Sequence, residues 1–193
     1  MKKWKKYYLS DVSRYGTDKI DRKKRILLKL FRKCQFSSNN IFGFINRVRF
    51  RKIKESLNVE LYGKTNIGYG LYVGHPFGIT INSNAIIGNN CNIHRGVLIG
   101  QENRGKRKGY PIIGNNVWIG INSAIVGKIT IGDDVMIAPN SFVNCNIPSH
   151  SIVFGNPCII KQKENATEDY IRNLVEVKWS KIVKAALSKW KKH

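Results

Sequence analysis

The sequence predicts a mainly β protein, a parallel solenoid of six-residue repeats with α-helices at both ends. An aliphatic residue recurs at every sixth position through most of the chain between Ile67 and Val143. One unbroken run ends at Ile99, and a second begins at Ile113. Neither a helix nor an ordinary strand has this period, whereas a hexapeptide solenoid does. Three repeats close one triangular coil, and stacked coils bury their aliphatic residues in a shared interior.

Two further sets of residues fit the same coil. Small or aliphatic residues four positions after each repeat residue should fill the rest of the interior, and they are Ala85, Cys91, Val97, Val117, Ser123, Val135 and Ser141. The corners should face solvent and hold residues that accept a positive φ. These are Gly88-Asn89-Asn90, Gly114-Asn115-Asn116 and Gly132-Asp133-Asp134.

One core should account for all 193 residues, because no Pro- or Ser-rich linker divides the chain. We expect a basic helical segment at 1–58, the solenoid at 59–161 and a basic amphipathic helix at 162–193. Apolar residues at helical spacing predict two helices within 21–58, interrupted near Ser37-Ser38-Asn39-Asn40. At the other end, Asn165 and Glu168 form a capping-box pattern that predicts a helix through Leu187.

The chain is strongly basic, with 34 Lys and Arg against 12 Asp and Glu and a formal net charge of +22. Such a charge attracts phosphates, anionic glycans, nucleic acid or an acidic membrane surface. No nucleic-acid-binding motif is present, so we expect no nucleic-acid partner. Lysines at 2–6 and 178–192 suggest peripheral contact with an anionic membrane. No run could span a bilayer, and no apolar stretch follows the basic start, so a cytoplasmic location is expected.

The four cysteines, Cys34, Cys91, Cys145 and Cys158, have no metal-ligand spacing. We therefore expect no zinc site, and each thiol should behave as a small buried hydrophobe in a reducing compartment.

Two interruptions of the repeat are candidate functional elements. At Gly74-His75-Pro76-Phe77-Gly78 the register slips by two residues, which places a histidine in a corner. At 101–111 a loop with four cations leaves the solenoid. A turn histidine is an ordinary solvated residue in many proteins, and a charged loop is often a plain excursion. Together they favour a site with a base and a flexible cationic arm.

At this point a family resemblance becomes specific. The chain resembles the serine acetyltransferase branch of the left-handed β-helix acyltransferases over residues 59–161. The motifs that carry the resemblance are Gly70-Leu71-Tyr72-Val73-Gly74-His75, Gly109-Tyr110-Pro111, Ile113-Gly114-Asn115-Asn116-Val117-Trp118-Ile119-Gly120 and Gly155-Asn156-Pro157. The resemblance implies a left-handed coil, a homotrimer, and acetyl transfer from acetyl-CoA without a metal. It also makes His75 the general base, with Glu60, fifteen positions earlier, orienting it.

The reaction that this implies is direct transfer. His75 would remove the proton from an acceptor hydroxyl as its oxygen attacks the thioester, and Glu60 would hold the imidazole tautomer. By resemblance, CoA lies between adjacent subunits of the trimer. Its contacts would be backbone at Gly100, Ile121 and Pro139, with Lys161, Arg104 and Lys106 at its phosphates.

The acceptor positions depart from the family pattern. Members that use L-serine carry an Asp before the catalytic His and an Arg-His pair before the loop-closing Pro, where this chain has Gly74, Gly109 and Tyr110. Without these charge partners serine should bind poorly, whereas Tyr110 can stack on a sugar ring. His94, nineteen residues after His75 and so about one coil above it, should have a packing or substrate-contact role rather than act as a second base. We therefore predict a carbohydrate acceptor, free or lipid-linked, in bacterial surface polysaccharide biosynthesis.

Three other functions are compatible with the sequence. Serine O-acetyltransferase activity in cysteine biosynthesis is the nearest alternative. A non-enzymatic binding or structural solenoid would leave His75, Glu60 and the loop without a purpose. A γ-type carbonic anhydrase would need three histidine ligands, and only His75 and His94 are near enough in the repeat.

Overall fold

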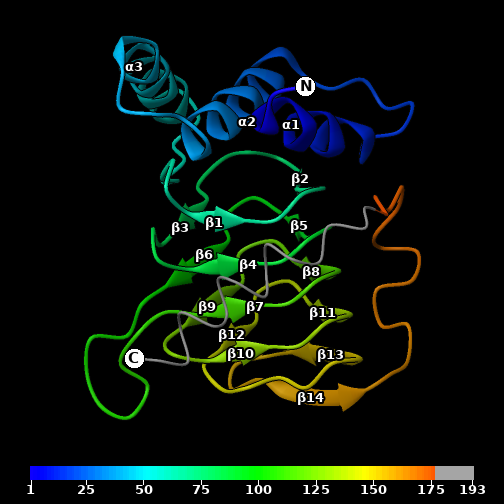
Figure 1. Ribbon diagram of the computed structural model, residues 1–193. Coiled ribbons are helices and arrows are strands. Elements are labelled where there is room, and N and C mark those ends of the chain that lie inside the picture. Colours follow the sequence, from blue (N-terminus) through cyan, green and yellow to red (C-terminus); the bar gives the residue numbers. More distant parts are fainter. Residues whose placement is uncertain (177–193) are drawn as a thin grey trace.

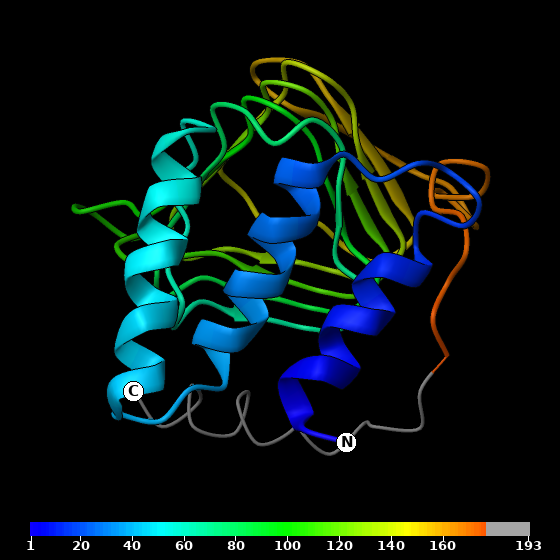
Figure 2. The same ribbon diagram turned by 90° about the horizontal axis from the view of Figure 1, so that it is seen from above.

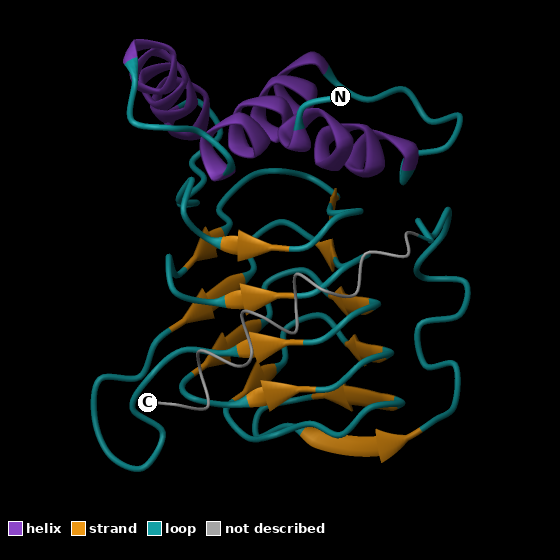
Figure 3. Cartoon of the chain, viewed as in Figure 1, coloured by secondary structure: helices purple, strands orange, loops and turns teal. Residues whose placement is uncertain are grey.

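The computed structural model describes residues 1–176, and residues 177–193 lie outside the described part. Three helices precede a stack of short strands (Figures 1 and 3). The helices are α1 (Lys3–Ser13), α2 (Arg22–Gln35) and α3 (Ile41–Glu55). The strands are β1 (Asn66–Ile67), β2 (Tyr72–Val73), β3 (Thr80–Ile81), β4 (Ile86–Ile87), β5 (Asn92–Ile93), β6 (Leu98–Gly100), β7 (Ile112–Ile113), β8 (Val117–Ile119), β9 (Ala124–Val126), β10 (Thr130–Ile131), β11 (Val135–Ile137), β12 (Phe142–Val143), β13 (Ser151–Phe154) and β14 (Ile159–Gln162).

The strands form the three flat faces of a left-handed parallel β-helix, which confirms the predicted fold class. Sheet 1 contains β1, β4, β7 and β10, and sheet 3 contains β3, β6, β9 and β12. Sheet 2 runs from β2 through β5, β8, β11 and β13 to β14, and only its last pair, β13 with β14, is antiparallel. Equivalent repeat residues stack from coil to coil, as in Ile93 on Ile119 and Ile119 on Ile137.

The interior is filled as the repeat predicts. The repeat isoleucines from Ile81 to Ile137 are at most 3% exposed, and the small residues between them are at most 2% exposed. Full burial of one such aliphatic side chain contributes about 1.5–3 kcal/mol, so this column dominates the stability of the fold. The corners adopt the expected left-handed conformation, with φ of +56° at Asn90, +53° at Asn116 and +54° at Asp134.

The three helices lie across the open first coil (Figures 1 and 2). α2 and α3 match the two predicted helices, and each begins at a side-chain cap: Asp21 accepts from the amide of Lys24, and Asn40 accepts from the amide of Gly43. α1 was not predicted as a separate helix. Two of its three buried residues, Ser10 and Asp11, are polar, so no apolar stripe marks its buried face, and its position depends on tertiary contacts.

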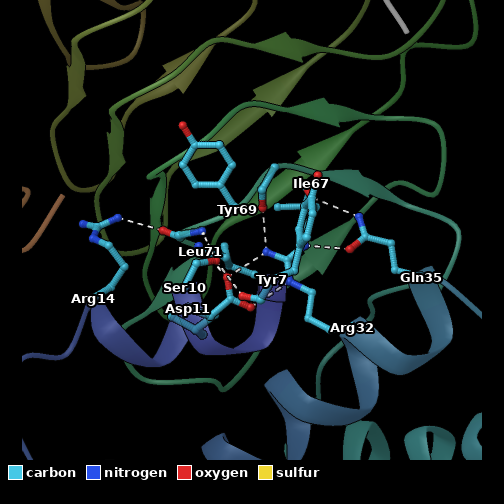
Figure 4. Close-up of polar contacts among 12 residues, drawn as sticks. Tyr7, Ser10, Asp11, Arg14, Arg32, Gln35, Ile67, Tyr69 and Leu71 are labelled. Carbon is cyan, nitrogen blue, oxygen red and sulfur yellow. Dashed lines mark hydrogen bonds and ion pairs between the residues drawn. The ribbon is translucent and has the colours of Figure 1, made fainter. Parts of the chain in front are cut away.

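Those contacts form a buried ion pair between α1 and α2 (Figure 4). The Asp11 carboxylate accepts from Arg32 Nε at 2.7 Å, from Arg32 Nη2 at 2.8 Å and from the Leu71 amide at 2.9 Å. Arg32 also donates to the carbonyls of Ile67 and Gly68 on the first coil. Both side chains are 0% exposed. The pair therefore provides hydrogen-bond partners for backbone groups at the open end of the solenoid and holds α1 and α2 against the first coil.

The predicted helix from Asn165 is wrong over its described part. Residues 164–176 form turns and an irregular stretch that runs beside sheet 2 (Figure 1). Positive φ angles at Asn165, Asp169 and Asn173 exclude a right-handed helix. The Tyr170 and Arg172 carbonyls accept from the Asn92 and Arg14 side chains, and the Val175 amide donates to Asn90, so tertiary hydrogen bonds take up backbone groups that a helix would use. The rest of the predicted helix, from residue 177, lies outside the described residues.

The cysteines follow the prediction only in part. All four are free thiols, and Cys91 is buried in the solenoid as expected. Cys34, Cys145 and Cys158 are partly exposed, which corrects the expectation that each is buried. The Sγ atoms of Cys145 and Cys158 lie 3.6 Å apart, a neighbourhood that their separation in the sequence did not indicate.

Candidate functional site

His75 occupies an unusually long corner between sheets 2 and 3. The connection from Val73 to Thr80 is two residues longer than the equivalent connection from Ile93 to Leu98, so the predicted slip of two residues is confirmed. The extra residues form a tight turn in which the Phe77 amide donates to the His75 carbonyl at 2.8 Å. His75 is exposed. The imidazole therefore projects from the solenoid and is accessible to an acceptor.

Glu60 lies one coil earlier, beside the same connection. It bridges to Thr80, and its amide donates to the Ile79 carbonyl at 2.7 Å. Its carboxylate accepts from the Tyr62 hydroxyl at 2.5 Å. Within residues 1–176, no hydrogen bond joins Glu60 to His75. The orienting role of Glu60 stays a prediction, and Tyr62 is a neighbour of the site that no sequence pattern marked.

A cavity next to Glu60 is bounded by the end of α3. It has a volume of about 430 Å³ and is lined by Arg51, Lys54, Glu60, Gly78 and Thr80, among others.

The hydrogen bond to Glu60, followed by burial and the charge of Glu60, raises the pKa of Tyr62. At neutral pH the Tyr62 hydroxyl is therefore a donor, and Glu60 is its acceptor.

His94 packs against Gly74, the residue before His75. The pairing of Val73 with Ile93 puts Gly74 and His94 at adjacent positions of neighbouring coils. The His94 ring lies between Tyr72, at 6.2 Å, and Trp118, at 4.9 Å, between ring centroids. Its Nε2 is buried without a hydrogen-bond partner among the described residues. A buried polar atom without a partner destabilises the fold, so Nε2 marks a polar position in this aromatic row.

Close packing explains why residue 74 is a glycine, a reason that the sequence did not reveal. A Cβ built at this position collides with His94 Nδ1. We expect Gly74→Ala to destabilise the fold by about 1–3 kcal/mol, the usual cost of overpacking. Urea denaturation measures this loss, and adding His94→Ala should restore most of it. Gly100→Ala is the matched control, because its Cβ would meet nothing closer than Leu98 Cδ1 at 3.7 Å. Equal losses in the two glycine variants would contradict the packing argument.

The environment of His94 also predicts a pH dependence. Burial, then the nearby His75 and Lys24, lower the pKa of His94 to about 4 from its ordinary 6.5. The unfolded chain therefore binds this proton more tightly, and stability should fall as the pH drops from about 6.5 towards 4. Urea midpoints between pH 7.5 and 4.5 should decline more steeply for the native chain than for His94→Gln. Parallel curves for the two proteins would refute this assignment.

The predicted CoA contacts are divided between two corners of the single chain. Ile121 and Pro139 lie at the His75 corner on later coils, whereas Gly100 and the loop at 101–111 lie at the corner beyond sheet 3. The Ile121 carbonyl already accepts from the Asn140 amide, and the Gly100 carbonyl accepts from the Gly127 amide. Each carbonyl retains one lone pair for a ligand.

The cationic candidates are equally dispersed. The loop closes as a small hairpin in which Glu102 and Gly109 exchange two backbone hydrogen bonds of 2.9 Å, leaving Arg104 and Lys106 exposed and Tyr110 half-buried. Lys161 lies on β14, with Nζ 5.7 Å from the centre of the Phe154 ring. One chain does not bring these groups to His75, so a complete site would need the loop of a second subunit.

No metal centre emerges from the described part of the chain. Within residues 1–176, no group of three or more His, Cys, Asp or Glu side chains is arranged to hold a metal ion. His75 and His94 have no third ligand there, so the geometry lends no support to the carbonic anhydrase alternative.

Comparison with known proteins gives one family model and many relatives. The model described as bacterial transferase hexapeptide (six repeats) matches residues 110–145. A serine acetyltransferase of Helicobacter pylori is 32% identical over 115 residues, which cover 60% of this chain and 67% of the relative. Serine acetyltransferase 2 of Arabidopsis thaliana is 30% identical over 136 residues, covering 65% of this chain but only 42% of the relative.

Solved structures of serine acetyltransferases are also similar to this chain. The serine acetyltransferase of Neisseria gonorrhoeae in complex with serine superposes with a TM-score of 0.69 and 26% identity, over 82% of this chain and 69% of that one. Soybean serine acetyltransferase, without ligand, superposes with a TM-score of 0.70 over the same shares at 23% identity, which supports the fold alone.

Proposed function

The chain belongs to the hexapeptide-repeat transferases, among which its relatives are serine acetyltransferases, and we propose from this that it is an acetyl-CoA-dependent O-acetyltransferase. The observation that carries the proposal is the exposed His75 in a corner two residues longer than the next. A purely structural solenoid has no need of this extension. The position that matches the family's general base therefore lies at one of the two places where the chain departs from the repeat.

The mechanism is a single displacement. His75 accepts the acceptor's hydroxyl proton while the oxygen forms a bond to the acetyl carbon of acetyl-CoA. The carbon–sulfur bond then breaks, and the proton passes from the imidazolium to the departing CoA thiolate. Glu60 would stabilise the imidazolium once a bond from His75 replaces the one from Tyr62. Positioning of two bound substrates supplies much of the remaining acceleration.

A trimer would complete this site. The split between the His75 corner and the loop corner supports a site shared by neighbouring subunits, in which the loop of one chain reaches the histidine of the next. Exposed apolar residues near the His75 corner also support an interface there. They are Phe77, Leu98 and Ile121, which are 57%, 38% and 37% exposed. CoA would bind in this groove, with Arg104, Lys106 and Lys161 as candidate phosphate contacts.

L-Serine is the first candidate acceptor, because the relatives described above are serine acetyltransferases and one of their structures contains serine. A sugar hydroxyl is the second candidate, and one specific observation favours it. His94 fills the space beside Gly74, so the acidic residue that serine-using members carry at this position has no room here. The relatives described above give no support to a role in polysaccharide assembly, which therefore rests on this observation and on Tyr110.

A competition between acceptors tests both candidates. Thiol release from acetyl-CoA is measured with L-serine and with a panel of hexoses, amino sugars and oligosaccharides. Turnover with serine at a catalytic efficiency above that with every sugar supports the first candidate. A preference for a sugar supports the second. A chain that binds CoA but turns over with none of these acceptors would contradict both.

A further inference from the structure

α3 exposes the apolar face that a helix in a water-soluble protein ordinarily buries. Ile41, Ile45 and Val48 follow one another at spacings of four and three residues, so they lie on one side of the helix. They are 65%, 44% and 40% exposed, and Phe42 and Phe44 beside them are 73% and 56% exposed. A cluster of five large apolar side chains of this kind marks a binding surface.

The helix is attached by its opposite side. Its buried residues are Gly43 and Phe50, and the Phe50 ring packs 6.1 Å from that of Phe31 on α2. α3 contacts α2 and lies at the edge of the helical layer, away from α1 (Figure 2). The apolar face therefore points away from the rest of the described chain.

Cations surround this face. Arg47, Arg49, Arg51 and Lys52 are exposed on α3, and no acidic residue lies between Asp21 and Glu55. A cavity of about 690 Å³ opens beneath the helix and is lined by Arg47, Arg51, Lys54 and Lys64, among others. An apolar ridge flanked by arginines is the pattern of a helix that lies in the plane of a membrane surface, where cations meet lipid phosphates.

We propose that α3 docks the protein on an anionic lipid bilayer, with Phe42, Phe44 and Ile45 entering the headgroup region and the arginines contacting lipid phosphates. A second copy of the same face is a poorer occupant, because a symmetric contact would oppose like charges. The proposed surface adjoins the cavity beside Glu60 through Arg51, but the inference does not depend on the proposed function.

Vesicle flotation of the full chain tests the proposal. The protein should float with vesicles of phosphatidylcholine and phosphatidylglycerol, and much less with phosphatidylcholine alone. Phe42→Ser/Phe44→Ser should lower the partition coefficient at least tenfold, since two buried aromatic contacts are lost. Ile159→Ser, at an apolar residue on β14 that is about as exposed as Phe44, is the control and should leave the partition coefficient unchanged.

The charge contribution is tested separately. Arg49→Gln should weaken binding about fivefold, the usual effect of one cation near an anionic surface, whereas Lys163→Gln should not. Equal binding of the native chain to neutral and anionic vesicles would overturn the proposal. So would full binding by the double Phe variant, which would assign docking to another basic segment. A native assembly that the Phe variant dissociates in sedimentation would show instead that the face joins copies of the chain.

Discussion

His75→Ala is expected to reduce the rate of acetyl transfer by about a hundred- to ten-thousand-fold, the range that general-base assistance contributes. The loss should appear in both kcat and kcat/KM, because the base acts in the transition state and is not needed to hold CoA. Stability should change little, since His75 is exposed and only its backbone takes part in the tight turn. Thiol release at saturating acetyl-CoA measures the rate, and urea denaturation measures the stability.

His150→Ala is the matched control for this variant. His150 is also exposed in part and lies in a corner, but it pairs with Asp134 between sheets 1 and 2, away from His75. Its removal should leave the rate within about twofold of the native chain, because it touches no candidate site residue. If His75→Ala kept more than a tenth of the native rate, another group would have to be the base.

Asp11→Ala is expected to produce the largest loss of stability, about 3–5 kcal/mol, because it leaves Arg32 charged and buried without its partner. The Leu71 amide would also lose its acceptor. We expect a correspondingly lower urea midpoint and earlier loss of the helical signal, since Asp11 connects α1 to α2 and to the first coil.

Two variants separate the ion pair from general effects of charge. Asp18→Ala removes an exposed carboxylate from the turn after α1 and should cost no more than about 0.5 kcal/mol. The double variant Asp11→Leu/Arg32→Met should lose less than Asp11→Ala, because no unpaired charge remains. A loss below about 1 kcal/mol in Asp11→Ala would mean that Arg32 finds water or another partner, against the buried geometry.

The solenoid could be predicted because its signal is local and repeated. Each isoleucine from Ile81 to Ile137 occupies the same position in the same unit, so the sequence period is also the spatial period. The Asp11–Arg32 pair could not be predicted in this way. It joins two helices to a coil across a gap of 21 residues, and no local pattern distinguishes these two charges from the many around them.

In the candidate site, too, the local feature could be predicted and the tertiary contact could not. The register slip identified His75, but the contact of Gly74 with His94 depends on how one long corner sits on a shorter one. Counting a full coil plus the slip from Gly74 would have led to His94. The helix expected at Asn165 does not form for a different reason, because side chains at the end of α1 and on the solenoid bind backbone groups of residues 170–175 that a helix would pair internally.

The most direct test of acetyl transfer follows the acetyl group itself. Isotopically labelled acetyl-CoA is incubated with the full chain and the preferred acceptor, and mass spectrometry locates the label. Direct transfer predicts one labelled O-acetyl ester on the acceptor for each CoA released, with no label on the protein. Release of CoA with the label only in free acetate, or in a lasting acetyl-protein, would contradict direct transfer promoted by His75.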